Sequence, residues 1–370
     1  MKKICILQNS MTFGGTDTFV INLCKGLIRD GYDVTVMLSV NKDEVLPREG
    51  ELISTGVKIK KTCHLYGVST KLKHLKILYK ELKIGKYDVF QTNIDLFNGP
   101  QMFVAWLAGV PIRECHSHNS EQGREMIDGR SLPIIVYQKI MRWLCWTFSN
   151  RRGGCSELAL DFLFEGNWKK DSKAKVIHNG IDFQEYQKEF IVEEKKAELG
   201  LHNKFNIATV GRISFQKNPE FLLDVFNEIC KEREDIDLVW CGKGEEEEHI
   251  CLKIQEYGLE SRVHLLGARS DIPEILRCTD LFFLPSRFEG LGIVLVEAQA
   301  ANLPCVMSDV IPEAVDCGLC LPLSLDLEKR MWAKEMTKIL DKGTDMHLDI
   351  GKLNEYSIEH MVKEMEDLFE

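Results

Sequence analysis

The sequence lacks long apolar runs, a zinc-binding pattern and a glycine-rich GxGxxG fingerprint. No apolar run approaches the ~20 residues of a membrane-spanning helix, and only four apolar residues follow the two lysines at the start, too few for a signal peptide. The 13 cysteines show no Cys and His spacing typical of zinc, which predicts reduced thiols rather than a disulfide framework. Without GxGxxG a nicotinamide site is disfavoured. We therefore expect a cytoplasmic protein.

Length and composition describe a globular chain with an uneven distribution of charge. The 370 residues are 44% apolar and 28% charged, which excludes a disordered or collagen-like chain and predicts two domains. The net charge is −10, yet residues 1–180 contain 26 Lys and Arg against 18 Asp and Glu, whereas residues 181–370 contain 21 against 39. The basic half predicts an anionic partner, either nucleic acid or a membrane surface. Because no nucleic-acid-binding motif is recognisable, nucleic acid is not expected.

Strands and helices alternate in two separate series. The first begins with a strand at 3–7 and a helix at 16–30, and the second restarts with a strand at 205–210. Such units form parallel sheets with right-handed crossovers. The sequence therefore predicts an α/β fold with two doubly wound, Rossmann-like domains facing a cleft. We place these domains at 1–183 and 184–350, with a last helix at 351–370. Ligands in such sheets bind beyond the carboxyl ends of the strands.

The segment SRFEGLGIVLVEA, residues 286–298, follows a predicted strand and opens an apolar helix. Glu289 and Glu297 stand eight residues apart, which is ~12 Å along a helix, so the two carboxylates can bind different hydroxyls of one ligand. Gly290 and Gly292 let helix amides approach a phosphate or a sugar oxygen. The alternative is that Glu289 only favours the helix dipole and Glu297 is a solvated surface residue.

The loop GRISFQKNPE, residues 211–220, also follows a predicted strand. Arg212 and Lys217 present two cations to one anion, as a diphosphate leaving group requires. The alternative is that both are solvated surface residues. The short motif DID at 235–237 resembles a metal-binding Asp-x-Asp, but it opens a strand instead of following one. We therefore expect no metal and no other cofactor.

Two clusters follow predicted strands in the first half. Gly14 and Gly15 in MTFGGTDTF can supply backbone amides to a ligand, although such glycines often serve only a turn. His116 and His118 in ECHSHNS share one face of a strand and could bind a metal, but no third ligand is fixed nearby. A polar contact from one histidine to a sugar is the more economical interpretation, and His116 can be purely structural.

Taken in order, these clusters resemble the family 4 retaining glycosyltransferases of the GT-B fold. The motifs that carry the resemblance span nearly the whole chain: GGTDTF, HSHN, CSELALDFLF, VIHNGID, GRISFQKNPE, CGKGE, LLGARSDI and FEGLGIVLVEA. They are most similar to the bacterial capsular and exopolysaccharide branch. The segment YSIEHMVKEMEDLFE is similar to the last helix of this fold, which crosses back to the first domain.

The resemblance implies an activity. A hexosyl or N-acetylhexosaminyl unit would pass from a nucleotide-sugar, expected to be a UDP-sugar, to a glycan or polyprenyl-linked sugar acceptor. The configuration at the anomeric carbon would be retained, and no metal would take part. Two alternatives remain open, a non-hydrolysing nucleotide-sugar epimerase and a non-catalytic nucleotide-sugar-binding module of the same fold.

The resemblance also implies roles for individual residues. The catalytic set would be His118 beside the sugar, Arg212 and Lys217 on the diphosphate, and Glu289 on the transferred sugar. The donor-binding set would comprise Gly14, Gly15, Asn179, Gly242, Arg269, Gly290, Leu291, Gly292 and Glu297. Within it, Gly242 and Arg269 would lie by the base, and Glu297 would hold the ribose.

Two segments of the basic half suggest a membrane contact. Residues 69–86 carry Leu72, Leu75, Tyr79 and Leu82 at helical spacing among lysines, and residues 137–152 add Trp143 among basic side chains. The membrane-facing candidates are Lys71, Lys73, Lys76, Lys80, Lys83 and Trp143. We expect a peripheral enzyme on the inner face of an anionic membrane. The alternative is that both apolar faces pack on the first domain's sheet.

Overall fold

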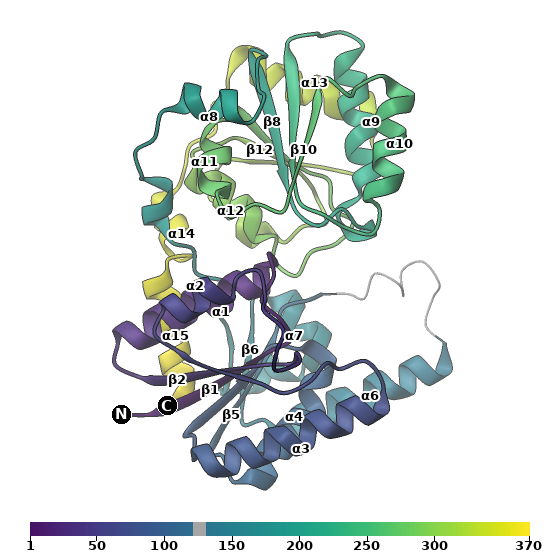
Figure 1. The fold of residues 1–370 in the computed structure, drawn as a ribbon. Helices are drawn as coiled ribbons and strands as arrows, with labels where there is room; N and C mark the ends of the chain where they lie inside the picture. The colour runs from purple at the N-terminus through teal and green to yellow at the C-terminus, as the bar shows by residue number, and fades with distance from the viewer. Residues whose placement is uncertain (121–130) are drawn as a thin grey trace. The chain divides into compact units, whose positions relative to one another are not determined.

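The computed structural model describes residues 1–120 and 131–370, which form two compact units (Figure 1). The first unit comprises Met1–Ile181 together with Glu355–Glu370, and the second comprises Asp182–Asn354. The chain thus leaves the first unit slightly before residue 183 and returns to it slightly after residue 351. No helix among the described residues is long and apolar enough to cross a membrane.

The first unit is built on a parallel sheet of seven strands in the order β3-β2-β1-β4-β5-β6-β7. Its strands are β1 (Lys3–Gln8), β2 (Asp33–Leu38), β3 (Lys58–Lys61), β4 (Val89–Thr92), β5 (Ile112–Ser117), β6 (Arg151–Gly154) and β7 (Ala174–Val176). The strand order reverses direction between β1 and β4. This topological switch point is where open α/β sheets bind ligands, beyond the carboxyl ends of the strands.

Helices cover both faces of this sheet, because alternate residues of each strand point to opposite sides. Ile4 and Ile6 of β1 pack with one helical layer, and Cys5 and Leu7 pack with the other. The first layer is α1 (Gly15–Arg29), α2 (Glu49–Ser54) and α15 (Ile358–Phe369); the second is α3 (Val68–Gly85), α4 (Asn98–Ala108), α6 (Leu132–Phe148) and α7 (Glu157–Phe164). Figure 1 shows α3, α4 and α6 together on one side of the sheet.

The last helix, α15, returns to the first unit as the sequence predicts. Met361, Val362 and Met365 are buried in the same core cluster as α1. A Cβ added at Gly26 of α1 would lie 2.2 Å from Cγ2 of Val362, so glycine allows the two helices to approach closely. The short helix before it, α14 (Ile350–Asn354), belongs to the second unit.

Strand β6 was not predicted, since its sequence RRGG contains no strand-forming side chain. A Cβ at Gly153 would lie 2.3 Å from Oε1 of Glu114 and 2.4 Å from Nδ1 of His116, both on β5. Neighbouring side chains therefore require glycine here. Arg152, which we had grouped with basic residues at a headgroup boundary, is only 8% exposed, and its guanidinium lies 3.9 Å from the ring centroid of Trp146.

The four apolar side chains of helix α3 that were predicted to share one face do not all face the core. Leu82 is buried and Leu75 packs against the core, whereas Leu72 and Tyr79 are exposed. The prediction of one apolar stripe is therefore wrong. Lys71 is partly buried, and its ammonium lies 5.2 Å from the ring centroid of Phe97 within the unit, so its contact with a membrane stays a prediction.

The second unit repeats the architecture with six parallel strands in the order β10-β9-β8-β11-β12-β13. Its strands are β8 (Phe205–Val210), β9 (Ile236–Cys241), β10 (Val263–Gly267), β11 (Leu281–Leu284), β12 (Cys305–Ser308) and β13 (Cys320–Leu323). Its longer helices are α8 (Val192–Glu198), α9 (Pro219–Cys230), α10 (Glu247–Tyr257), α11 (Ile272–Arg277), α12 (Ile293–Ala300) and α13 (Lys329–Lys342). Here the switch point lies between β8 and β11.

The 13 cysteines are free thiols in the structure. Cys317 and Cys320 have CxxC spacing just before and at the start of β13, and both are free and buried. Burial raises the pKa of the Cys317 thiol to about 12, so it is a poor nucleophile.

Candidate active site

At the switch point of the second sheet, two loops bring Lys217 and Glu289 together. The loop after β8 carries Lys217 and the loop after β11 carries Glu289. The ammonium Nζ of Lys217 donates to Oε1 of Glu289 at 2.7 Å, and the carboxylate also accepts hydrogen bonds from Gln216 Nε2 at 3.1 Å and Ser286 Oγ at 2.7 Å. Glu289 is 6% exposed. Two of the predicted catalytic residues, the buried Glu289 and the partly buried Lys217, therefore form one hydrogen-bonded ion pair.

Further bonds hold the two loops in register. The backbone N–H of Arg287 donates to the carbonyl of Gln216 at 2.8 Å, and its guanidinium donates to the carbonyl of Phe215 at 2.6 Å. Ser308 Oγ of β12 donates to the carbonyl of Ser286 at 2.6 Å. These bonds fix the loop that carries Glu289 against the loop that carries Lys217 and against β12. Gln216 and Ser286 were not predicted as site residues, although both stand within the motifs GRISFQKNPE and SRFEGLGIVLVEA.

Arg212 does not join this pair. Its side chain is 71% exposed, and its Nε lies 3.0 Å from Oε2 of Glu245, in the acidic run that follows β9. Ion pairs this exposed contribute little to stability, so an anion could displace Glu245 from the guanidinium.

Gly242 and Gly211 allow close packing at the carboxyl ends of β8 and β9. Gly242 has φ +147°, and a Cβ there would lie 1.9 Å from the carbonyl oxygen of Gly211. Glycine at this position therefore has a structural reason, and its predicted contact with the base stays a prediction. Arg269, the other predicted neighbour of the base, is held by Asp271 at 2.8 Å and by Glu198 at 3.1 Å.

Helix α12 begins at Ile293, so Glu289 lies in the preceding loop. The predicted spacing of Glu289 and Glu297 along one helix is therefore wrong. Gly292 caps the helix with φ +87°, and Gly290 and Leu291 are buried beside it. Glu297 is half-buried within the helix. Burial and, secondly, the charge of Glu297 raise the pKa of Tyr186 well above its usual value.

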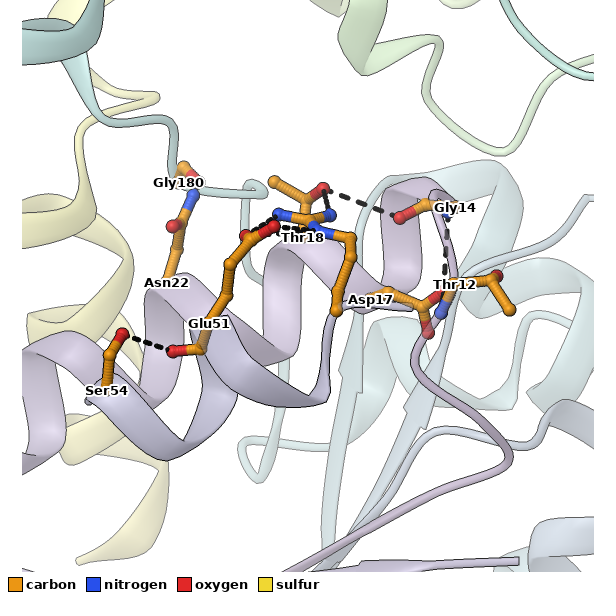
Figure 2. A network of polar contacts seen from close by, with 9 residues as sticks. Thr12, Gly14, Asp17, Thr18, Asn22, Glu51, Ser54 and Gly180 are labelled. Atoms are coloured by element: carbon orange, nitrogen blue, oxygen red, sulfur yellow. Dashed lines mark hydrogen bonds and ion pairs between the residues drawn. The ribbon is translucent and has the colours of Figure 1, made fainter. Parts of the chain in front are cut away.

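In the first unit, Asp17 lies in the first turn of α1 (Figure 2). Its buried carboxylate accepts hydrogen bonds from Gln8 Nε2 at 2.7 Å, from the amide and hydroxyl of Thr12 at 2.8 Å each, and from the amide of Gly14 at 3.3 Å. The Gly14 amide that we assigned to a ligand is thus already engaged by Asp17. Gly15 is exposed as the first residue of α1. Asp17 was missed, although Asp three residues after a helix cap is a recognisable capping pattern.

Asn179 lies beside the same helix. Asn22 of α1 donates to the carbonyl of the adjacent Gly180 at 2.8 Å, which fixes this segment (Figure 2). Asn179 is 7% exposed, and its Oδ1 has no hydrogen-bond partner in the part of the chain that the structure describes. This oxygen can therefore accept a bond from a ligand.

His116 and His118 form a buried pair at the carboxyl end of β5. Their ring centroids lie 4.7 Å apart, and the ring of Phe19 lies 4.9 Å from each. His116 Nδ1 is 3.0 Å from Oε1 of Glu114. Burial lowers the pKa of His116 to about 3, and burial and then the charge of His116 lower the pKa of His118 well below its usual value. Both imidazoles are therefore neutral near pH 7.

The hydrogen bonds around His118 assign its tautomer. Asn93 Nδ2 donates to the carbonyl of Leu7 at 3.3 Å, so its Oδ1 faces His118 Nε2 at 2.9 Å. Nε2 must then carry the proton, which leaves Nδ1 as an acceptor. His118 Nδ1 has no hydrogen-bond partner among residues 1–120 and 131–370. It can accept a hydrogen bond from a hydroxyl.

Across the described residues, no group of three or more His, Cys, Asp or Glu side chains is placed to hold a metal ion. The second aspartate of DID, Asp237, is buried within β9 and accepts a hydrogen bond from Asn203 Nδ2 at 2.7 Å. It therefore has a structural role in the strand.

Comparisons with known proteins agree with this architecture. Residues 13–185 match the family model "Glycosyltransferase Family 4", and residues 191–316 match "Glycosyl transferases group 1". The chain is 29% identical to the putative glycosyltransferase EpsF of Bacillus subtilis over 355 residues, which covers 92% of this chain and 88% of EpsF.

Another relative and a solved structure add detail. The chain is 30% identical over 258 residues to the UDP-Gal:alpha-D-GlcNAc-diphosphoundecaprenol alpha-1,3-galactosyltransferase of Escherichia coli, covering 67% of this chain and 64% of that enzyme. The crystal structure of Anabaena Alr3699/HepE in complex with UDP and glucose superposes with a TM-score of 0.82 at 18% identity, covering 99% of each chain. Such a structural likeness shows the fold. The chain belongs to the family 4 glycosyltransferases of the GT-B fold.

Proposed function

We propose that this protein is a retaining glycosyltransferase of capsule or exopolysaccharide synthesis. It would transfer a hexosyl or N-acetylhexosaminyl unit from a UDP-sugar to a glycan or polyprenyl-linked sugar acceptor. The observation that carries the proposal is the ion pair of the partly buried Lys217 with the buried Glu289 at the switch point of the second sheet. The names of the relatives support the choice of substrates, since UDP is bound in HepE and the galactosyltransferase is named for a diphosphoundecaprenol acceptor.

In this proposal Lys217 and Arg212 bind the diphosphate. One N–H of the Lys217 ammonium is used by Glu289, and the other two are available to phosphate oxygens. Arg212 exchanges its exposed partner Glu245 for the diphosphate. Negative charge grows on the β-phosphate as the leaving group departs, and both cations together with the amides at the N-terminus of α12 stabilise it. Each cation contributes about 3 kcal/mol to the transition state, by analogy with single oxyanion-hole donors.

Glu289 binds the sugar that is transferred. Lys217, Gln216 and Ser286 fix the orientation of its carboxylate before substrate arrives, so the carboxylate is preorganised to bind sugar hydroxyls. The acceptor hydroxyl attacks the anomeric carbon from the face that the diphosphate leaves, and a phosphate oxygen takes the hydroxyl proton. No carboxylate acts as nucleophile, and no divalent cation takes part.

The test is an acceptor-dependent transfer assay over a panel of UDP- and GDP-sugars, with and without EDTA. We expect transfer from a UDP-sugar that persists in EDTA, and an anomeric configuration in the product that matches the donor. Glu289→Gln should abolish transfer, while the control Glu232→Gln, at an exposed glutamate of the same unit, should leave it unchanged. Epimerisation of the nucleotide-sugar without acceptor, or activity restored only by a divalent cation, would overturn the proposal.

A further inference from the structure

We propose that the surface formed by α3, α4 and α6 of the first unit docks on a membrane containing anionic phospholipid. Called the docking face below, it is defined by residues 68–85, 98–108 and 132–148. The choice of a lipid surface as partner rests on the proposed function, in which the acceptor can be lipid-linked. The evidence for a docking face is independent of that function, because it comes from exposed side chains alone.

Helix α6 presents its apolar stripe to the outside. Leu132, Val136, Ile140 and Trp143 recur at spacings of three and four residues, and they are 74%, 48%, 48% and 59% exposed. The opposite side of the helix buries the polar Gln138. A surface helix of a globular protein ordinarily has the reverse arrangement, with its apolar stripe in the core. The apolar stripe of α6 therefore faces away from the core and is open to an apolar partner.

Aromatic side chains continue this surface onto α4. Phe103, Trp106 and Leu107 are exposed. The ring of Phe148, at the end of α6, lies 4.9 Å from Phe103, 5.3 Å from Trp106 and 6.2 Å from Trp143, so one aromatic cluster joins the two helices. Tryptophan is enriched where one end of a side chain meets hydrocarbon and the other meets water. A cluster of this size is typical of an interaction site.

Helix α3 adds positive charge beside the apolar cluster. Lys73, Lys76, Lys80 and Lys83 are exposed, and Leu72 and Tyr79 lie among them on the outer side of the helix. Within the described part of the chain, none of these four lysines forms an ion pair. Figure 1 shows α3, α4 and α6 on the same side of the first sheet.

Charge complementarity decides between two occupants of the docking face. A second copy joined face to face would set these lysines against the same lysines, which repel. An anionic headgroup layer neutralises them, and the acyl boundary accepts Leu132, Val136 and Trp143. The combination of apolar side chains with uncompensated lysines therefore fits an anionic bilayer surface.

The experiment is co-sedimentation of the full chain with vesicles of phosphatidylcholine alone and of phosphatidylcholine mixed with phosphatidylglycerol, at low and high salt. We expect binding to the anionic vesicles at low salt and release at high salt. Replacing Lys73, Lys76, Lys80 and Lys83 together by Gln should weaken binding by about fivefold per lysine. The matched control replaces four other exposed lysines of the first unit, Lys2, Lys42, Lys170 and Lys173, by Gln and should bind like wild type.

A second variant tests the apolar part. Leu132→Ser with Val136→Ser removes two exposed apolar side chains of α6 without touching the core, and it should also lose vesicle binding while melting like wild type. The docking face is refuted by equal binding to neutral vesicles, by no binding at low salt, or by equal losses in the lysine control. A wild type that self-associates while these variants are monomers would show that a second copy covers the face.

Transfer to a water-soluble acceptor, measured without vesicles, separates this proposal from the proposed function. The variants of the docking face should retain that activity. If wild-type protein binds anionic vesicles but no donor is transferred, the docking face stands and the proposed function fails. If transfer proceeds but no vesicles are bound, the proposed function stands and the docking face fails.

Discussion

Lys217 and Arg212, the two cations of the proposed site, have different surroundings. Lys217 contacts the buried carboxylate of Glu289. Glu289 accepts bonds from three side chains, whereas Arg212 has one exposed partner in Glu245. The loss of Lys217 therefore removes both a phosphate ligand and a partner of a buried carboxylate. The loss of Arg212 removes only a phosphate ligand.

Lys217→Ala should lower kcat/KM by roughly 100-fold or more, as expected for the loss of ~3 kcal/mol of transition-state stabilisation, and it should also lower the melting temperature. Arg212→Ala should lower kcat/KM comparably and leave the melting temperature unchanged, because an exposed ion pair contributes little to stability. Steady-state kinetics and thermal unfolding measure both. Glu245→Ala is the control, and a large loss of activity in it would contradict the role given to Arg212.

The buried side chain of His74 should make the stability of the first unit depend on pH. Thr62 Oγ1 donates to the carbonyl of Leu38, so it accepts from His74 Nδ1 at 2.8 Å, and Nε2 faces Gln101 Nε2 at 3.2 Å. These bonds suit the neutral ring, and burial lowers the pKa of His74 to about 4 from an ordinary 6.5. Between about pH 4 and pH 6.5, His74 is therefore protonated in the unfolded chain but neutral in the folded chain.

Because the folded pKa is lowered, stability should be full above about pH 6.5 and fall as the pH decreases toward 4. His74→Gln should reduce the steepness of this fall, measured by urea denaturation at a series of pH values. His202→Gln, at an exposed histidine, should leave the slope as in wild type. An unchanged slope in His74→Gln would mean that His74 is protonated in the folded protein.

The sequence of strand β6 is determined by the side chains that pack against it from neighbouring elements. Its two glycines leave room for Glu114 and His116 of β5 and for Leu160 of α7. The strand pairs with β5 and β7 on both sides, so backbone hydrogen bonds stabilise it although it has no β-branched or aromatic side chain.

Gly153→Ala should destabilise the first unit by about 1–3 kcal/mol, the usual range for overpacking a core. The added Cβ would meet Glu114 and His116 at less than van der Waals distance. Gly50→Ala in α2 is the matched control, since a Cβ there meets nothing within 4 Å and alanine favours a helix. Urea denaturation compares the two. Equal stability of both variants would show that the β5 side chains move aside without cost.

At the scale of the whole molecule, α15 joins the C-terminus to the first unit. Ile358, Met361, Val362 and Met365 are part of the core that contains α1. The second unit, Asp182–Asn354, has its own core of strands and helices.

Deleting residues 355–370 should therefore lower the unfolding temperature of the first unit and leave that of the second unit unchanged. Differential scanning calorimetry should resolve the two transitions, and UDP, if it binds at Lys217, should raise only the transition of the second unit. A parallel decrease of both transitions in the truncated protein would show that the units unfold together.

The sequence by itself determined the two strand-helix series, the parallel sheets and the loops in which Lys217 and Glu289 stand. Alternation of apolar residues, glycine turns and position after a strand are local signals, and they need no knowledge of distant contacts. The family resemblance depended on the same local motifs.

Only the tertiary structure decided which of those residues meet and which faces stay exposed. It paired Lys217 with Glu289, turned Arg212 toward Glu245, engaged the Gly14 amide with Asp17 and made a strand of RRGG. It also placed the apolar stripe of α6 outside the unit. The physical reason is that hydrogen-bond partners and burial depend on segments far apart in the chain, whereas a sequence pattern reports only its neighbours.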